Sequence, residues 1–173
     1  MELKQWIIDA FAARVFEGNP AAVVPLADWL PARLMQAIAA ENNLSETAFL
    51  VEAAPGRYGL RWFTPAMEVD LCGHATLASA YVVFSHIAPA LNDVAFDTRS
   101  GQLTVTRGDG GLMEMDFPAI RAEVPPDAPG IGRRLAEAMG SPLPKEIYAA
   151  PDLMAVFDHA DAVRALNPAG ALG

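Results

Sequence analysis

Cysteine is almost absent from this sequence, whose 173 residues include one, Cys72. A single thiol cannot form an internal disulfide. The first six residues contain no basic segment followed by a long apolar stretch, so no secretory signal is visible. These features indicate a cytoplasmic protein.

Basic residues are also scarce, because 12 lysines and arginines stand against 21 aspartates and glutamates and give a net charge of -9. Nucleic acids and anionic membranes are bound through clustered Lys and Arg, so we expect neither as a partner. The longest mainly apolar stretch, 75–87, is shorter than the roughly 18 to 20 residues that cross a bilayer. A small molecule or another protein is the expected partner.

The chain has enough apolar residues for a core, with 53% hydrophobic and 19% charged residues. Its first part shows short apolar segments separated by Gly, Pro and Asp, which predict strands, and one helix that begins with a proline. The predicted helix covers 31–42, a turn covers 18–20, and the strands are 3–11, 21–25, 47–51, 58–63, 94–98, 103–107 and 112–117. This pattern predicts an α+β fold with a curled, mostly antiparallel sheet.

The segment 73–86 predicts a second helix that differs from the rest because it has almost no polar face. A helix that is apolar on all sides belongs in the centre of a fold. Small residues such as Ala75, Ala78 and Ser79 would let strands approach it closely. We therefore expect the sheet to wrap around this helix.

A proline-rich segment, 119–130, predicts a linker after a first unit that covers residues 1–118. The pattern then starts again over 131–173. Nothing after Pro168 resembles the end of a domain, so this part is expected to be the incomplete start of a second unit. The predicted elements here are helices at 131–139 and 161–166 and strands at 146–150 and 153–157.

The start of the central helix is a candidate anion site, because a helix N-terminus exposes unpaired N–H groups and a partial positive charge. The amides of Gly73, His74 and Ala75 could hold a substrate carboxylate, and Gly73 would allow a close backbone approach. The alternative is that Gly73 only permits a tight turn from strand to helix.

Glu46 is the candidate general acid/base, since it lies between the first helix and an apolar strand, where a carboxylate would be partly desolvated. The alternative is a solvated side chain at a helix end. His74 could carry a proton near neutral pH, or it could be a hydrogen-bonded structural group. Asp70 is a candidate substrate-binding residue next to the turn from strand to helix, where it could orient His74, pair with Arg61, or be a solvated turn residue.

Cys72 suggests a competing mechanism, because a thiol beside a helix N-terminus can have a lowered pKa and act as the base of a racemase. Cysteine is also a common small core residue. A thiol racemase normally needs a second base on the opposite face of the carbon, and the sequence has no second cysteine. The carboxylate mechanism is therefore favoured.

Five blocks of sequence, in the same order along the chain, closely resemble the PhzF-like isomerase family. They are Asp9-Ala10-Phe11 with Phe16, Gly18-Asn19-Pro20-Ala21-Ala22-Val23, Asn43-Leu44-Ser45-Glu46-Thr47-Ala48-Phe49, Arg61-Trp62-Phe63-Thr64-Pro65, and Glu68-Val69-Asp70-Leu71-Cys72-Gly73-His74-Ala75-Thr76. The resemblance implies a diaminopimelate epimerase-like fold of two similar halves. In such a fold each half curls a sheet around a central helix, and the active site lies between the halves.

The resemblance also implies roles for individual residues. Glu46 matches the catalytic acid/base, which moves a proton on a small amino-acid-like or unsaturated acid without a metal or organic cofactor. Gly73 and His74 match the turn that lines the substrate pocket, and Asn19 lies in a block that approaches it. Cys72 matches a catalytic cysteine of related epimerases and racemases. A homodimer is expected from the family.

No second glycine-rich, helix-opening turn follows Gly140 in this sequence, although the family's second half would supply one. Either the sequence is a truncated product or another chain completes the site. Two functions follow as hypotheses. The first is a cofactor-independent isomerase that uses Glu46, and the second is a non-catalytic protein for small-acid binding or assembly.

Overall fold

A computed structural model describes residues 2–14 and 16–167 and divides the chain into two compact units. Unit 1 is Met1–Phe117 and unit 2 is Pro118–Gly173. Each unit is described by itself. The last residues of the predicted incomplete half, 168–173, lie outside the described residues.

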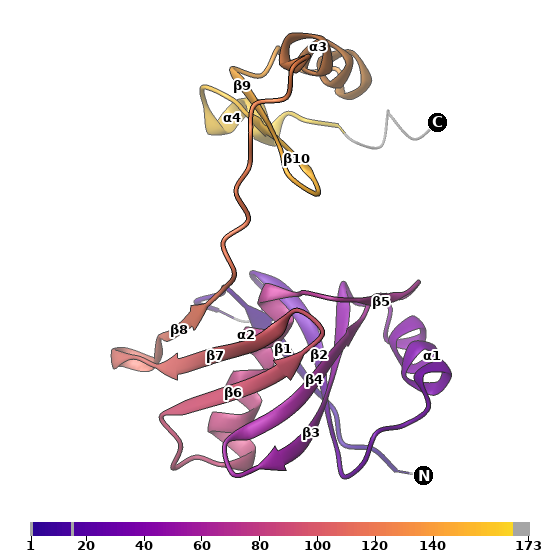
Figure 1. The fold of residues 1–173 in the computed structure, drawn as a ribbon, viewed down its shortest axis with the longest axis vertical. Coiled ribbons are helices and arrows are strands. Elements are labelled where there is room, and N and C mark those ends of the chain that lie inside the picture. The colour runs from indigo at the N-terminus through magenta and orange to yellow at the C-terminus, as the bar shows by residue number, and fades with distance from the viewer. Residues whose placement is uncertain (1, 15, 168–173) are drawn as a thin grey trace. The chain divides into compact units, whose positions relative to one another are not determined.

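One curled sheet forms most of unit 1 (Figure 1). Its strands are β1 (Trp6–Ala10), β2 (Asn19–Leu26), β3 (Glu46–Ala54), β4 (Arg57–Phe63), β5 (Glu68–Val69), β6 (Asp93–Thr98), β7 (Gly101–Arg107) and β8 (Met113–Asp116). They lie in the order β1-β2-β3-β4-β6-β7-β8, and β5 pairs with β4. The pairs β2–β3 and β4–β6 are parallel and the other pairs are antiparallel. The predicted α+β class and mostly antiparallel sheet are therefore confirmed.

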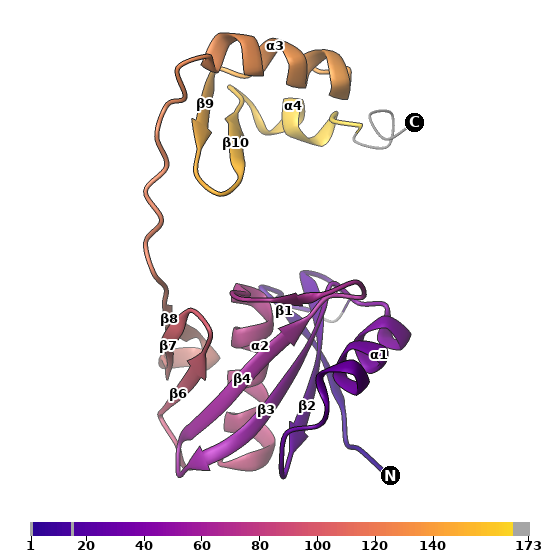
Figure 2. The same ribbon diagram turned by 45° about the vertical axis from the view of Figure 1, so that its right-hand side comes forward.

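Two α-helices lie on opposite faces of this sheet (Figure 2). Helix α1 (Ala32–Asn42) packs on the outer face, where Met35 and Ala39 contact Phe49 and Phe63. Helix α2 (Gly73–Val82) lies inside the curl of the sheet. Within residues 2–14 and 16–167, no helix combines the length and the apolar character that a bilayer crossing requires.

The packing of α2 explains why the sheet can close around it. Ala75, Ala78 and Ala80 are almost completely buried, and their small side chains let the strands approach the helix backbone. The prediction of a central helix is confirmed. The α-helix ends at Val82 and continues as a π-helical turn, η1 (Val83–Ile87), rather than as the predicted α-helix to His86.

The η1 turn has its own partner in the sheet. Arg107 donates a hydrogen bond of 2.9 Å from Nη2 to the Phe84 carbonyl, and its guanidinium lies 4.8 Å from the centre of the Phe84 ring. A π-turn redirects backbone carbonyls away from the α-helical pattern. Arg107 lies on β7, and its contacts with Phe84 anchor the end of the helix to the sheet.

The alternation of side chains in β3 decides which residues face α2. Ala48 and Leu50 belong to the core around α2, whereas Phe49 belongs to the core under α1. Because successive side chains of a strand point to opposite faces, Glu46 shares the α2 face with Ala48 and Leu50.

The element bounds predicted for the first 20 residues need correction. The first strand covers Trp6–Ala10 rather than 3–11, because Phe11 adopts a left-handed conformation with φ of 58°. The predicted turn at 18–20 is also too long, since Asn19 and Pro20 already pair with β1. Gly18 has φ of 77°, and a side chain there would collide with the Ala10 carbonyl.

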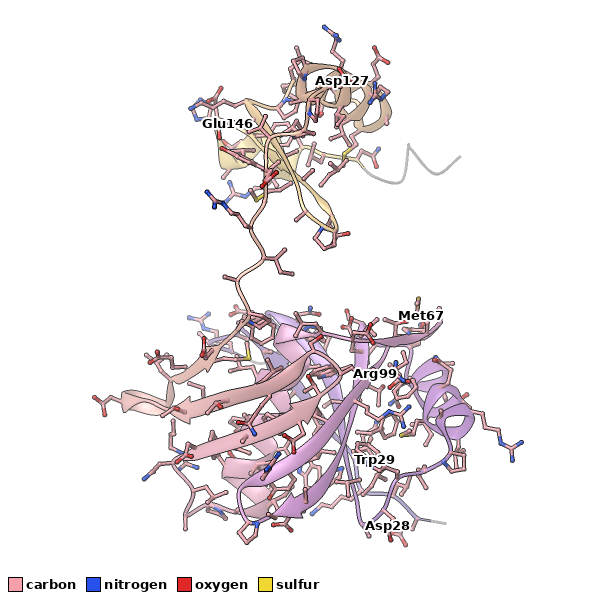
Figure 3. All side chains as sticks on the ribbon, viewed as in Figure 1. Asp28, Trp29, Met67, Arg99, Asp127 and Glu146 are labelled. Atoms are coloured by element: carbon pink, nitrogen blue, oxygen red, sulfur yellow. The ribbon has the colours of Figure 1, made fainter. Side chains whose placement is uncertain are left out.

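Unit 2 contains α3 (Ala128–Met139), β9 (Glu146–Ala149), β10 (Leu153–Val156) and α4 (Ala160–Arg164). Strands β9 and β10 form an antiparallel pair. The predicted linker 119–130 is too long, because α3 begins at Ala128 rather than at residue 131. Asp127 (Figure 3) caps this helix by accepting a hydrogen bond from the Gly130 amide, and Pro129 lies in its first turn.

The central packing of α2 generates the first prediction. Ala78→Leu adds apolar volume to a filled core and should lower the free energy of unfolding by about 1–3 kcal/mol. The matched control is Ala40→Leu on the exposed side of α1, which should change it by less than about 0.5 kcal/mol. Urea unfolding followed by tryptophan fluorescence measures this, because Trp6, Trp29 and Trp62 all lie in unit 1. Equal shifts for both variants would contradict a central position of α2.

Candidate active site

Glu46 begins β3 directly after the link from α1. Asn43 ends α1 in a left-handed conformation with φ of 50°, which turns the chain back toward the sheet. In the parallel pair β2–β3, Glu46 lies opposite Ala21. The Glu46 side chain is 18% exposed, so the carboxylate is largely removed from solvent but still accessible.

The start of α2 lies opposite this carboxylate. Cys72 precedes the helix in an extended conformation, Gly73 is its first residue, and the His74 side chain is 9% exposed. Ala75 is fully buried, and its amide, like that of His74, lies near the Cys72 sulfur. The first turn of α2 thus brings free N–H groups and an imidazole to the face of the sheet that carries Glu46.

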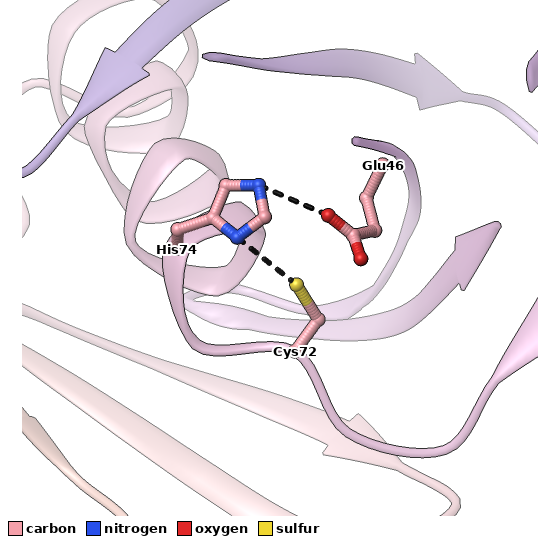
Figure 4. A group of neighbouring side chains, drawn as sticks. All are labelled: Glu46, Cys72 and His74. Carbon is pink, nitrogen blue, oxygen red and sulfur yellow. Dashed lines mark hydrogen bonds and ion pairs between the residues drawn. The ribbon is translucent and has the colours of Figure 1, made fainter. Parts of the chain in front are cut away.

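Glu46, Cys72 and His74 form a cluster in which the imidazole faces both of the other side chains (Figure 4). His74 Nε2 lies 3.1 Å from Glu46 Oε2, and His74 Nδ1 lies 3.4 Å from Cys72 Sγ. The Nε2–Oε2 pair is at hydrogen-bond distance but lacks hydrogen-bond alignment, and in the described part of the chain neither atom has another partner. Two buried polar atoms are therefore left for a ligand to satisfy.

Burial determines the charge of His74. It lowers the pKa of the imidazole, and this effect exceeds the opposing influence of the Glu46 charge and of the Pro20 carbonyl. The ordinary pKa is about 6.5, so His74 is neutral at pH 7. The contact between Glu46 and His74 is consequently not an ion pair at neutral pH.

Of the two alternatives for Cys72, an activated thiol and a small core residue, the structure favours the core residue. Burial raises the pKa of the thiol to about 12, although the amides of Ala75 and His74 act in the opposite direction. The nearby Glu46 charge adds to the increase. Desolvation therefore outweighs the favourable end of the helix dipole, and Cys72 remains a protonated thiol at neutral pH.

The cluster combines three types of metal-ligand side chain, whose ligand atoms lie within 4.8 Å of one another. The two imidazole nitrogens, however, face different partners, Nε2 toward Glu46 and Nδ1 toward Cys72 (Figure 4). One metal ion binds one nitrogen of an imidazole and needs its ligands to converge on a point. In the described arrangement each ring nitrogen lies beside a different side chain, and the two partners do not face the same nitrogen.

Asp70 lies outside this cluster, and its side chain is 72% exposed. It pairs with Arg99 (Figure 3) at 3.4 Å, while Arg61 forms two hydrogen bonds to Glu68 at 2.7 and 2.8 Å. The expected pairing of Asp70 with Arg61 or His74 is therefore wrong. The third alternative, a solvated turn residue, agrees with the exposure of the Asp70 side chain.

Asn19 lies at the edge of the site, on the strand next to Glu46. Its Oδ1 accepts a hydrogen bond of 3.1 Å from the Oγ of Ser45, which is the residue before Glu46. Sequence reasoning missed Ser45, although it lies in the same block as Glu46. The contact joins the starts of β2 and β3 on the surface beside the cluster.

Comparisons with known proteins identify the family of this chain. Residues 8–170 match the family model described as PhzC-PhzF, phenazine biosynthesis-like protein. An uncharacterized isomerase of Pseudomonas aeruginosa is 50% identical over 168 residues, which are 97% of this chain and 62% of that protein. The human phenazine biosynthesis-like domain-containing protein is 44% identical over 159 residues, or 88% of this chain and 54% of its own length. The chain thus spans 54% to 62% of the length of these curated relatives.

Solved structures give the same result. A PhzF-family phenazine biosynthesis protein from Enterococcus faecalis has a TM-score of 0.84 and 45% identity, over 97% of this chain and 62% of that one. A predicted epimerase from Pseudomonas aeruginosa has a TM-score of 0.69 and 30% identity, over 80% of this chain and 51% of its own. The resemblance that the five sequence blocks indicate is confirmed, and the chain belongs to the PhzF family of phenazine biosynthesis-like proteins.

Proposed function

We propose that this chain carries the acid/base half of a cofactor-independent isomerase site that acts on a small amino-acid-like or unsaturated carboxylic acid. The observation that carries the proposal is the pair of unsatisfied buried atoms, Glu46 Oε2 and His74 Nε2, at the start of α2. The names of relatives as isomerases and as a predicted epimerase support the reaction class.

In the proposed reaction, the Glu46 carboxylate removes a proton from a substrate carbon and returns it to another position or face. General bases of this kind lie in partly desolvated sites within reach of the proton. The first-turn amides of α2 at Gly73, His74 and Ala75, of which Gly73 is the least buried, bind the substrate carboxylate and stabilise the negative charge that develops on it. Neutral His74 beside Glu46 orients the base and does not add a positive charge.

The thiol mechanism is the less favoured alternative. A base must be deprotonated to accept a proton, and Cys72 with a pKa of about 12 is a thiol at neutral pH. Glu46 is more exposed than Cys72 and therefore more accessible to a substrate.

The proposal concerns the half-site that these residues form, because the chain spans 54% to 62% of its relatives' length. A homodimer remains part of this proposal. The second candidate function is a small-acid-binding or assembly protein without catalysis. It is favoured if the chain binds small acids and exchanges none of their carbon-bound protons.

Glu46→Gln should abolish proton exchange because an amide cannot accept the substrate proton. We expect the rate of deuterium incorporation from D₂O to fall at least about 100-fold, with binding retained. Proton NMR of a panel of α-amino and unsaturated carboxylic acids measures both. Glu52→Gln, the same change on an exposed position of β3, is the control and should exchange like the parent chain. Parental exchange by Glu46→Gln would show that another residue is the base.

Gly73→Ala separates the role of the α2 amides from the role of the turn. Gly73 has no left-handed conformation, and a Cβ there would lie 3.8 Å from the Met115 and Phe117 side chains, so stability should be kept. Carboxylate binding should weaken about 10- to 100-fold, because the methyl group obstructs one charge-assisted hydrogen bond. Gly108→Ala, at an exposed glycine with φ of -92°, is the control in the same NMR titration. Unchanged affinity would place the carboxylate elsewhere.

Cys72 should resist thiol reagents in the folded chain, since burial raises its pKa to about 12 and limits access. At pH 8 we expect Ellman's reagent to react at least about 100-fold faster after unfolding in urea than before. Rapid reaction of the folded chain would instead favour the thiol mechanism. N-acetylcysteine at the same pH and urea concentration provides the reference rate.

A further inference from the structure

The contact between Cys72 and His74 has no role in the reaction proposed above, although it buries two polar groups together. Cys72 Sγ lies 3.4 Å from His74 Nδ1, within hydrogen-bond distance for sulfur. Cys72 is 8% exposed and the His74 side chain is 9% exposed, so water has little access to either group. Which atom carries the proton in this contact decides the tautomer of the imidazole.

The thiol has two neighbouring acceptors, His74 Nδ1 and the Glu46 carboxylate, and within the described residues the contact with Nδ1 is the one that meets hydrogen-bond geometry. A protonated thiol has a hydrogen to give, and burial keeps Cys72 in that state because its pKa is about 12. A neutral imidazole has one N–H and one acceptor nitrogen. If Nδ1 accepts from the thiol, the imidazole hydrogen must be on Nε2.

The other end of the imidazole requires the same tautomer. Nε2 lies 3.1 Å from Glu46 Oε2, and an ionised carboxylate only accepts hydrogen bonds. A hydrogen on Nδ1 would leave the lone pair of Nε2 facing the carboxylate lone pairs in a site that is poorly solvated. The Nε2–Oε2 contact lacks hydrogen-bond alignment, so it acts on the tautomer through the repulsion between two lone pairs. Together with the thiol contact at Nδ1, it favours the Nε2–H form.

We propose that Cys72 is a positioning residue, whose S–H···Nδ1 hydrogen bond holds His74 in the Nε2–H tautomer so that the imidazole N–H faces the Glu46 carboxylate. The proposed tautomer is supported by the contacts at the two ring nitrogens, and its catalytic consequence rests on the proposed function of Glu46. A fixed N–H donor beside the carboxylate sets the direction in which Glu46 can accept a substrate proton. The cysteine in this PhzF-family chain thus acts through histidine and does not touch the substrate.

Nitrogen NMR of the whole chain tests this proposal without a substrate. Long-range ¹H–¹⁵N correlation spectra of the ¹⁵N-labelled chain at pH 7 distinguish a protonated from an unprotonated ring nitrogen. The sequence has three histidines, and His74→Gln identifies the His74 signals. We expect His74 to show a protonated Nε2 and an unprotonated Nδ1. A protonated Nδ1, or a doubly protonated ring, would overturn the proposal.

Two variants separate the hydrogen bond from simple packing. Cys72→Ser retains an O–H donor and should keep both nitrogen shifts near the parental values. Cys72→Ala removes the donor, so a population with hydrogen on Nδ1 should appear and the two shifts should move toward each other. Identical shifts in the parent chain and Cys72→Ala would overturn the role of Cys72. The signals of His86 and His159 are internal controls and should not move.

The remaining measurements keep this result separate from the reaction. Urea unfolding monitored by tryptophan fluorescence checks that each variant is folded before its spectrum is interpreted. If Cys72→Ala changes the tautomer but Glu46→Gln exchanges protons normally, the positioning role stands and the isomerase proposal fails. If Glu46→Gln loses exchange while the His74 tautomer is independent of Cys72, the isomerase proposal stands and the positioning role of Cys72 fails.

Discussion

The structure of unit 1 depends on the close packing of a curled sheet around α2. Ala75, Ala78 and Ala80 are buried almost completely, so the strands contact the helix along most of its surface. A helix enclosed in this way places its first turn inside the fold rather than at the surface. The burial of Cys72 and His74, and the perturbed pKa values that follow, are consequences of this packing.

The register of the sheet brings Glu46 to the same place. The parallel pairing of β2 and β3 sets Glu46 opposite Ala21, and the two-residue alternation of β3 directs its side chain to the α2 face. A shift of one residue would move the carboxylate to the α1 face. The site therefore depends on two long-range constraints, the depth of α2 and the register of β3, which meet at Glu46 and His74.

The sequence was sufficient to predict the central helix, most strands and the position of Glu46 between the first helix and a strand, because each leaves a local pattern of apolar periodicity or a recognisable block. It did not predict that His74 would contact Glu46, since that contact joins positions 28 residues apart in the sequence and requires the sheet register. The preference of Asp70 for Arg99 was missed for the same reason. For Cys72, proximity to a helix N-terminus was visible in the sequence, but the extent of burial that reverses its effect on the thiol pKa was not.

The π-helical turn η1 after α2 makes the orientation of the first turn of the central helix less dependent on the number of residues at its other end. Each residue added within an α-helix rotates everything beyond it by about 100°, which would turn one end relative to the other. A π-helical turn is wider than an α-helical turn and accommodates an extra residue within that turn. Arg107 donates a hydrogen bond to the carbonyl of Phe84 in this turn. Length changes near Ile87 are therefore expected to be absorbed at η1 without rotating His74 away from Glu46.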